Sequence, residues 1–339
     1  MNKKRVLAML LAGAMALSMI ACGGGNSAST DGSSNDGGAS ASSGSYKVSV
    51  ILKTLAAEYW QYVKSGAEDY ASEHSDKVTV EVKGPSSETA FDEMQNMIET
   101  DLSSGSYDGV IISPLQSDTA AQLVSGTKLP IVAIDTNFTA PEVKSFVGTG
   151  NEAAAKKGGE AAVEAAKAAG WTDIKCIEIA GVQGDQTNTA RMNGYKAGVE
   201  EAGGTFLSDE VQYADATADR ATTAMEAIMQ THPEGIAIIC ANNDDMAMAA
   251  ARAAQGHDAY KNTIFLGFNG DRAACEAILA GQMTMSVAQM AYEMGYKAVE
   301  TMVQVLDGET VDEFVDSGSD VVTPDNAQER LGTLKTQLH

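Results

Sequence analysis

The sequence predicts an α/β protein of two doubly wound, parallel-sheet lobes, and three observations carry that prediction. After residue 46, short Val/Ile-rich runs alternate with amphipathic segments of 12 to 20 residues, which is typical of βαβ units. The runs are continuously apolar, as in parallel strands that helices cover on both faces. Ten such runs are too many for one compact sheet of this kind, so we divide them into two lobes, with the chain crossing near residues 148–151.

The first 22 residues predict a secretory signal peptide. Lys3, Lys4 and Arg5 precede an uncharged, mostly apolar run that ends before Ala21 and Cys22. A small residue before cysteine resembles a bacterial lipobox, in which Cys22 is lipidated and becomes the new N-terminus. The alternative is an ordinary signal peptide and a free secreted protein.

Residues 23–45 are almost entirely Gly, Ser, Ala, Asn and Asp, which predicts a flexible tether with a reach of ~25 Å. No later segment approaches the ~18 apolar residues that a membrane span needs, so we expect membrane contact through the lipid anchor only. The formal charge is −23, and it becomes −26 without the signal peptide (20 basic against 46 acidic residues). Such a chain is a poor partner for nucleic acid, and solubility outside the cell explains the charge.

The predicted strands and helices follow one another in a regular order. Strands are expected at 47–52, 78–82, 109–112, 131–134, 145–147, 174–179, 210–213, 236–240, 264–268 and 285–288, and helices at 91–102, 153–169, 190–202 and 220–230, among others. In the stretch after the first strand, helical spacing with Val63, Ala67 and Tyr70 places Tyr59 on the core face. The neighbouring Trp60 is then left for another role.

Ligands of open α/β sheets bind beyond the carboxyl ends of the strands. The polar residues at those ends are Lys53, Ser113, Asp135, Thr149, Asn242, Asn243, Asp244, Asn269 and Gln289. The set has many donors and acceptors but no nucleophile–base pair, which favours a polyhydroxylated ligand over an enzyme substrate. We also expect no cofactor and no metal, because neither a phosphate-binding glycine loop nor a cluster of His or Cys at metal spacing is present. Cys176, Cys240 and Cys275 are expected as small buried residues, with at most one disulfide among them.

An ordered series of motifs resembles a known family. The series is Leu52-Lys53-Thr54 with Tyr59-Trp60, Tyr107-Asp108-Gly109 before Ser113-Pro114-Leu115, Ile134-Asp135-Thr136, Ala190-Arg191-Met192-Asn193-Gly194-Tyr195, Ala241-Asn242-Asn243-Asp244-Asp245-Met246-Ala247, Gly267-Phe268-Asn269-Gly270, and Ala280-Gly281-Gln282-Met283-Thr284 before Ala288-Gln289. From about residue 46 to 330 the chain resembles the type I periplasmic sugar-binding proteins, of the ribose- and allose-binding kind. The resemblance implies two lobes joined by a three-strand hinge. It implies a first lobe of 46–148 plus about 290–315, with a helix at 292–306, and a second lobe of 149–289 plus about 316–339.

The resemblance also implies the ligand-binding residues. Asp135 corresponds to a first-lobe carboxylate, Arg191 to a second-lobe arginine whose fork bonds two oxygens, and Trp60 to an aromatic wall for a sugar ring. The other expected ligand residues are Lys53, Tyr59, Asn243, Asn269 and Gln289. Ordinary structural roles compete with these: Asp135 as a turn cap, Arg191 paired with Glu200 or Asp185, Trp60 in packing, and Asn243 or Asp244 as a helix cap. We expect Asn243 to contact the ligand and Asp244 to cap.

Three positions depart from the family pattern. Asn269 stands where an aspartate is usual, Ala216 where a second-lobe aromatic is usual unless Tyr213 replaces it, and Gly150 where an aspartate is common. A specificity for ribose or allose is therefore not carried over.

The function that these features indicate is capture of a monosaccharide or related polyol and its delivery to an ABC permease by closure of two lobes. We expect a monomeric lipoprotein on the outer face of the cell membrane. The alternative is a ligand-sensing lipoprotein that reports to a membrane sensor kinase or chemoreceptor, since closure serves both tasks.

Overall fold

The structure is a computed structural model that describes residues 45–338. The predicted signal peptide, Cys22 and all of the predicted tether except Ser45 lie outside the described residues. Residues 44–339 form one compact unit. No helix among the described residues combines the length and the apolar character needed to cross a membrane.

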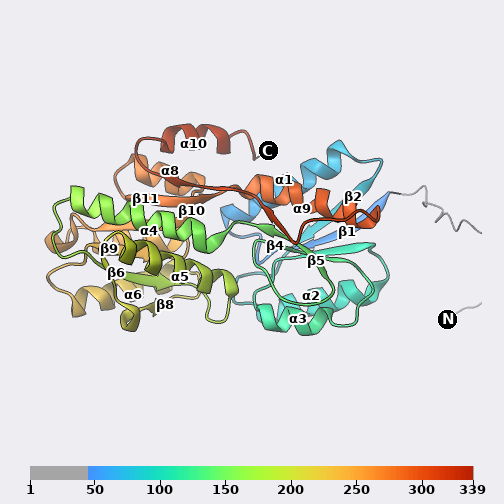
Figure 1. The fold of residues 1–339 in the computed structure, drawn as a ribbon, viewed down its shortest axis with the longest axis horizontal. Coiled ribbons are helices and arrows are strands. Elements are labelled where there is room, and N and C mark those ends of the chain that lie inside the picture. The colour runs from blue at the N-terminus through green and yellow to red at the C-terminus, as the bar shows by residue number, and fades with distance from the viewer. Residues whose placement is uncertain (1–44, 339) are drawn as a thin grey trace, which may run out of the picture. The chain divides into compact units, whose positions relative to one another are not determined.

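The first lobe is built on a six-stranded parallel sheet with the order β12-β5-β4-β3-β1-β2. Its strands are β1 (Tyr46–Ile51), β2 (Val78–Lys83), β3 (Gly109–Ile112), β4 (Ile131–Ile134), β5 (Val143–Gly148) and β12 (Phe314–Asp316). Helices α1 (Glu58–Glu73) and α9 (Ala291–Leu306) cover one face, and α2 (Phe91–Ser104) and α3 (Ser117–Val124) cover the other (Figure 1). Val48 and Val50 pack toward the first pair, while Ile51 and Ile112 pack toward the second, because successive side chains of a strand alternate between faces.

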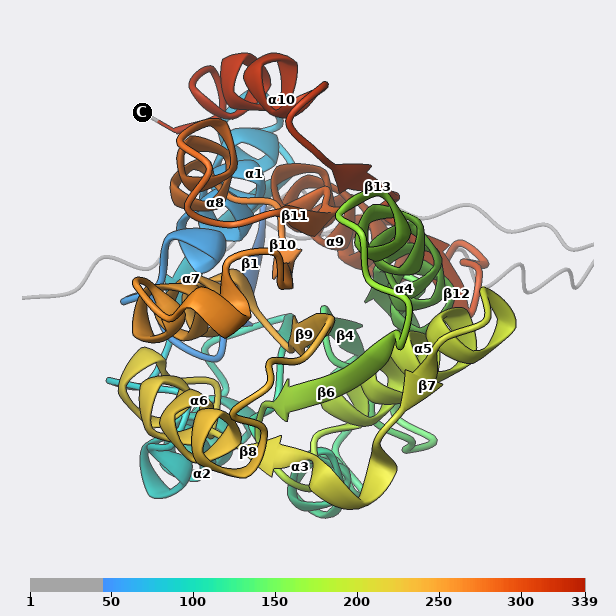
Figure 2. The same cartoon turned by 90° about the vertical axis from the view of Figure 1, so that its left-hand side faces the viewer.

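The second lobe contains a seven-stranded sheet. Its main order is β13-β11-β10-β9-β6-β7, with β8 also beside β6, and only β13 is antiparallel to its neighbour. The strands are β6 (Lys175–Ala180), β7 (Thr205–Phe206), β8 (Gln212–Tyr213), β9 (Ile238–Ala241), β10 (Ile264–Asn269), β11 (Met285–Gln289) and β13 (Ser319–Val322). Helices α4 (Asn151–Ala168) and α5 (Gln186–Glu201) lie on one face, with α6 (Ala218–Thr231), α7 (Asp244–Ala254) and α8 (Arg272–Leu279) on the other (Figure 2). The last helix, α10 (Ala327–Leu334), packs against α8.

The chain passes between the two sheets three times within the described residues. It leaves the first sheet after β5, returns to it after β11 through α9, and leaves again between β12 and β13. Two α/β lobes with a three-strand connection confirm the predicted fold class.

The strand predicted at 210–213 is longer than the one observed. A 3₁₀ turn occupies Ser208–Glu210, and only Gln212 and Tyr213 pair with β6. The short strands β7, β12 and β13 were not predicted from the apolar pattern, because each has too few buried apolar residues to produce one. Cys176, Cys240 and Cys275 are buried and free, with 3.4 Å between the Sγ atoms of Cys176 and Cys240.

Two glycines allow α1 and α9 to approach closely. A Cβ atom at Gly66 would lie 2.0 Å from the carbonyl oxygen of Tyr292, and one at Gly295 would lie 1.9 Å from that of Val63. No side chain fits at either position, so the chain's return to the first lobe depends on both glycines.

Candidate functional site

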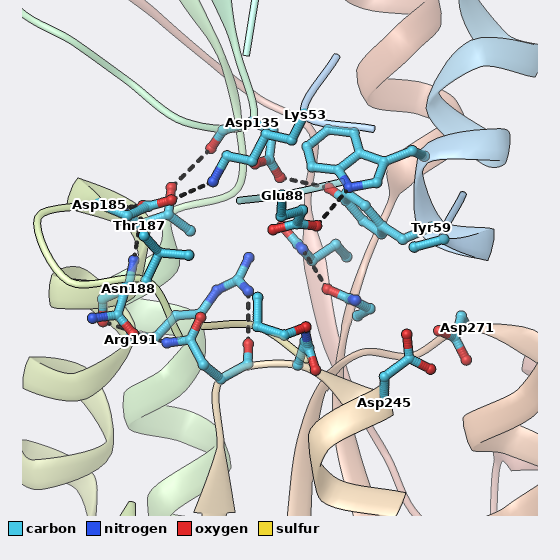
Figure 3. Close-up of a pocket in the computed structure, with 18 residues that line it drawn as sticks. Lys53, Tyr59, Glu88, Asp135, Asp185, Thr187, Asn188, Arg191, Asp245 and Asp271 are labelled. Atoms are coloured by element: carbon cyan, nitrogen blue, oxygen red, sulfur yellow. Dashed lines mark hydrogen bonds and ion pairs between the residues drawn. The ribbon is translucent and has the colours of Figure 1, made fainter. Parts of the chain in front are cut away.

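The carboxyl ends of strands from both sheets meet at one cleft of about 630 Å³ (Figure 3). Its lining residues are Lys53, Ala57, Tyr59, Trp60, Glu88, Asp135, Val182, Asp185, Thr187, Asn188, Arg191, Ala216, Asn242, Asn243, Asp245, Asn269, Asp271 and Gln289. All eight residues expected to bind the ligand are therefore brought together. Of the other strand-end residues, Ser113 and Thr149 are buried elsewhere.

Asp135 follows β4 and places its carboxylate in the first-lobe side of the cleft. The residue is buried, and its φ of 63° lies in the left-handed region that non-glycine residues seldom adopt. Its carboxylate accepts hydrogen bonds from the hydroxyls of Tyr59 (2.7 Å) and Thr136 (2.9 Å). Since no described contact of this side chain is to its own backbone, the turn-cap alternative has no support here. Unusual backbone geometry of this kind is common at functional sites.

Tyr59 and Trp60 form the aromatic wall of the cleft at the start of α1. Their ring centroids are 4.9 Å apart in an edge-to-face arrangement with an interplanar angle of 82°. The indole N–H of Trp60 donates to Glu88 over 2.9 Å, which fixes the ring. Helical spacing predicts only Tyr59 in the core, but both side chains are buried and both reach the cleft.

Lys53, directly after β1, forms an ion pair with Asp185 of the second lobe. Both side chains are buried. Burial alone would lower the pKa of Lys53, but the nearby carboxylates of Asp185, Asp135 and Glu88 outweigh it and raise the pKa. Asp185 also caps α5, because one of its oxygens accepts the backbone N–H groups of Thr187 and Asn188. The lysine is thus held, charged, between the lobes.

Arg191 on α5 is held in the second-lobe side of the cleft by three contacts. Its Nε donates to Asn151 (2.9 Å), its Nη1 donates to the carbonyl of Asn242 (2.8 Å), and its guanidinium lies 3.8 Å from the ring centre of Phe268. No ion pair among the described residues joins it to Glu200 or Asp185. The guanidinium is therefore oriented by neutral groups, which leaves its charge available to a ligand.

Asn243 is the N-cap of α7, and the expectation that Asp244 would cap this helix is wrong. Asn243 has the extended backbone of a cap, and its Oδ1 accepts the N–H of Met246 over 2.9 Å. Asp244 lies one residue further and is fully buried, where it accepts from the N–H of Gly270 (2.7 Å) and the hydroxyl of Ser286 (2.6 Å). Burial raises the pKa of Asp244 to about 6.

Asn269 and Gln289 stand at the ends of the neighbouring strands β10 and β11. The Nε2 of Gln289 donates to Oδ1 of Asn269 over 3.0 Å. The Oε1 atom of the fully buried Gln289 has no hydrogen-bond partner among the described residues. Since an unpaired buried acceptor is costly, this atom is a candidate contact for a ligand donor.

Comparison with known proteins places this cleft in a family. A model of the periplasmic binding protein domain matches residues 48–310. The chain belongs to the periplasmic binding protein family. It is 30% identical over 264 residues to the D-allose-binding periplasmic protein of Escherichia coli, covering 75% of this chain and 82% of that protein. It is 27% identical over 268 residues to the ribose import binding protein of the same organism, covering 78% and 86%.

A solved structure supports the same fold. The carbohydrate transporter solute-binding protein of Agrobacterium radiobacter, in complex with D-arabinose, has a TM-score of 0.77 and 23% identity, covering 88% of this chain and 100% of that one. The resemblance to type I periplasmic sugar-binding proteins is thus confirmed. Membership of this family implies an extracytoplasmic location.

Several cleft residues of this periplasmic binding protein were not predicted. Asp245 and Asp271 each follow a strand closely and could have been found by extending the strand-end search by two residues. Glu88 lies in the loop after β2, where no pattern marks it. Of the three departures, Asn269 and Ala216 line the cleft and Gly150 does not. The exposed Tyr213 does not line it either, so it does not replace the missing aromatic.

Proposed function

We propose that this protein captures a monosaccharide or related polyol outside the cell and delivers it to an ABC permease. The observation that carries the proposal is the cleft itself, which combines an aromatic wall with fixed donors and acceptors from both lobes. The relatives also support it, because their names describe binding of D-allose, ribose and D-arabinose. Those relatives are transport binding proteins, and we propose that no catalysis occurs here.

Each expected ligand residue has a role that its contacts allow. In the proposal, the face of Trp60 packs on the C–H face of a sugar ring, and Asp135 accepts from sugar hydroxyls. Arg191 and Lys53 donate to ring or hydroxyl oxygens. The remaining polar contacts in the proposal come from the side chains of Tyr59, Asn243, Asn269 and Gln289.

Closure of the lobes would be the signal that the permease recognises. Contacts between the lobes already include the Lys53–Asp185 ion pair, a 2.9 Å hydrogen bond from Thr187 to Thr136, and the pair of Arg272 with Glu58 at 2.9 Å. A ligand that contacts both lobes adds to these contacts only in the closed state and so shifts the equilibrium toward it.

We propose that the protein is a monomeric lipoprotein, cleaved before Cys22 and tethered by residues 23–45. The lobe boundaries that accompany this proposal are 46–148 with about 290–315, and 149–289 with about 316–339. Labelling of expressing cells with a fatty-acid analogue tests the anchor. Label on the wild type and none on Cys22→Ser is the expected result, and equal label on both would contradict it.

A thermal-shift screen of residues 44–339 against pentoses, hexoses, polyols, nucleosides and amino acids tests the ligand class. A ligand at 100 times its dissociation constant adds about 2.7 kcal/mol to the free energy of unfolding, a readily visible shift. We expect the shift among sugars or polyols. A response to amino acids or nucleosides alone would overturn the proposal.

A further inference from the structure

The side chains that line the cleft carry a net negative charge, which a neutral ligand would not offset. Five carboxylates line it, from Glu88, Asp135, Asp185, Asp245 and Asp271, against the two cations Lys53 and Arg191. Lys53 pairs with Asp185, and its charge also acts on Asp135 and Glu88. The excess therefore falls at the other end of the cleft.

Asp245 and Asp271 form that acidic end. They follow the neighbouring strands β9 and β10, lie on the same side of the cleft in Figure 3, and neither has an ion-pair partner among the described residues. One oxygen of Asp271 caps α8 by accepting the N–H of Ala274 over 2.9 Å, and no described hydrogen bond involves the other. The side chain of Asp245 makes no described hydrogen bond.

None of the nearby arginines forms an ion pair with Asp245 or Asp271 among the described residues, although the charge of Arg252 acts on Asp245. Arg330 donates to the carbonyl oxygens of Gly270 and Gln289, and Arg272 pairs with Glu58. Burial raises the pKa of Asp271, and the charges of Asp244 and Asp245 raise it further. The acidic end therefore holds carboxylates that repel one another and that form no ion pair among the described residues.

An independent observation marks the same end as a ligand contact. The strand β11 lies beside β10, and its last residue, Gln289, is fully buried with Oε1 unpartnered. Because the Nε2 of Gln289 donates to Asn269, Oε1 is the atom left to face a donor. The unpaired acceptor of Gln289 thus lines the same cleft as Asp245 and Asp271, on a strand beside the one that Asp271 follows.

We infer that the ligand carries a protonated amino group, as in an amino sugar or amino polyol, and that this group binds at the acidic end of the cleft, beside Asp245 and Asp271. The inference rests on the proposed capture of a sugar or polyol in this cleft. An ammonium group has three donors and one positive charge, so it satisfies three acceptors and offsets the excess negative charge at once. A neutral hydroxyl gives one donor and no charge. It would therefore leave the buried carboxylate of Asp271 without a compensating charge.

Calorimetric titration with matched probes tests the inference. The probes are D-glucosamine against D-glucose and N-acetyl-D-glucosamine, and D-galactosamine against D-galactose, with calcium chloride as an inorganic cation. We expect one amine to bind about ten- to hundredfold more tightly than its neutral parent, as is typical of a hydrogen bond between charged groups. No group of three or more His, Cys, Asp or Glu residues in 45–338 is arranged to hold a metal ion, and calcium is expected not to bind.

Substitutions at the acidic end separate this inference from the proposed function. Asp245→Asn and Asp271→Asn should each reduce amine affinity about tenfold, and neither should weaken the binding of neutral sugars, because each removes an uncompensated charge. Asn can still cap α8, and the exposed Asp245 has no described hydrogen bond or ion pair to lose. Glu226→Gln, which removes a charge from an exposed site on α6, is the matched control and should change neither.

The outcomes are distinct. Neutral sugars that bind as tightly as their amines, or amine binding insensitive to both substitutions, would overturn the inference and leave sugar capture standing. Calcium binding that Asp271→Asn abolishes would also overturn it, in favour of a metal. Failure of every sugar and amino sugar to bind would contradict the proposed function and the inference together.

Discussion

Glu178, on β6 behind the cleft, is a buried carboxyl group without a full set of partners. It is fully buried, and neither of its oxygens has a hydrogen bond of good geometry, although Asn242 and Arg191 lie near enough to act on its charge. Burial raises its pKa from 4.5 to about 8, so the group is neutral in the folded protein at pH 7. A neutral Glu178 near Arg191 does not offset the positive charge of the guanidinium, which we assign to ligand binding.

The raised pKa of Glu178 predicts a loss of stability at higher pH. The folded protein holds the proton more tightly than the unfolded chain, so this stabilisation is complete below pH 4.5 and is lost as the pH rises to about 8. At ~1.36 kcal/mol per pKa unit, the loss is at most roughly 5 kcal/mol. Urea unfolding at pH 5, 6.5 and 8 should show this decline in the wild type and a smaller one in Glu178→Gln. Parallel curves for the two proteins would contradict it.

Two substitutions of Trp60 can distinguish stacking of its ring on the ligand from packing within the protein. Trp60→Phe keeps an aromatic face but removes the N–H that Glu88 accepts, whereas Trp60→Ala removes both. Because aromatic contacts contribute about 0.5–1.5 kcal/mol beyond area burial, we expect Trp60→Ala to weaken binding of the best ligand about tenfold and Trp60→Phe less than about threefold. Titration of both variants checks this, and equal losses would indicate that Glu88, not the ring face, dominates.

At the scale of elements, each lobe contains a pair of closely packed helices that positions binding residues. Gly66 and Gly295 join α1 to α9, and in the second lobe Gly194 and Gly198 let α5 approach α4, where a Cβ at Gly198 would lie 2.0 Å from the carbonyl oxygen of Lys156. These pairs hold α1 and α5, which carry Trp60 and Arg191. The position of the binding residues therefore depends on backbone contacts far from the cleft.

Substitution of a contact glycine should destabilise the protein. Gly295→Ala forces its Cβ against the carbonyl of Val63, and overpacking of this kind costs about 1–3 kcal/mol. Gly332→Ala on α10 is the matched control, because nothing lies within 4 Å of the added Cβ and alanine favours a helix by about 0.5–1 kcal/mol. Chemical unfolding should show a lower free energy of unfolding for Gly295→Ala and no decrease for Gly332→Ala. Similar free energies for the two variants would mean that α1 and α9 can move apart without cost.

Elements and site residues differ in how far they could be predicted. The long apolar runs predicted β1, β3, β4 and β10 closely, because burial on both faces leaves an unbroken signal. The crossing strands β12 and β13 have no such signal, and only the family resemblance predicted the return to the first lobe. Lys53, Asp135 and Gln289 were found by position at strand ends, whereas Glu88 reaches the cleft from a loop, which sequence periodicity does not describe.

At the scale of the whole molecule, the two lobes are linked by contacts of unequal strength. The Lys53–Asp185 pair is buried within the cleft, whereas Arg272 and Glu58 meet near the surface with side chains 48% and 21% exposed. Neither Arg272 nor Glu58 lines the cleft, so this pair can be changed without touching the proposed ligand contacts. Its loss acts on closure and, through the unpaired charge of Glu58, on the carboxylates of Asp245 and Asp271.

Removal of the outer contact should weaken binding slightly through closure. Exposed ion pairs contribute up to about 1 kcal/mol, so Arg272→Gln should raise the dissociation constant by no more than about fivefold, and the difference should vanish in 1 M salt. Lys261→Gln, at an exposed lysine outside the cleft with no described ion pair, is the control. A large, salt-resistant loss in Arg272→Gln would mean that the arginine contacts the ligand.

The most direct test of the account is calorimetric titration of residues 44–339 with the strongest ligand of the screen, beside Asp135→Ala and Arg191→Ala. These residues face each other from the two lobes, and each loss removes a charge-assisted hydrogen bond worth about 1.5–3 kcal/mol. We expect one sugar or polyol per chain in the wild type and affinity at least about tenfold lower in each variant. Saturable binding of the same ligand that neither substitution weakens would contradict it, because the ligand would then bind outside this cleft.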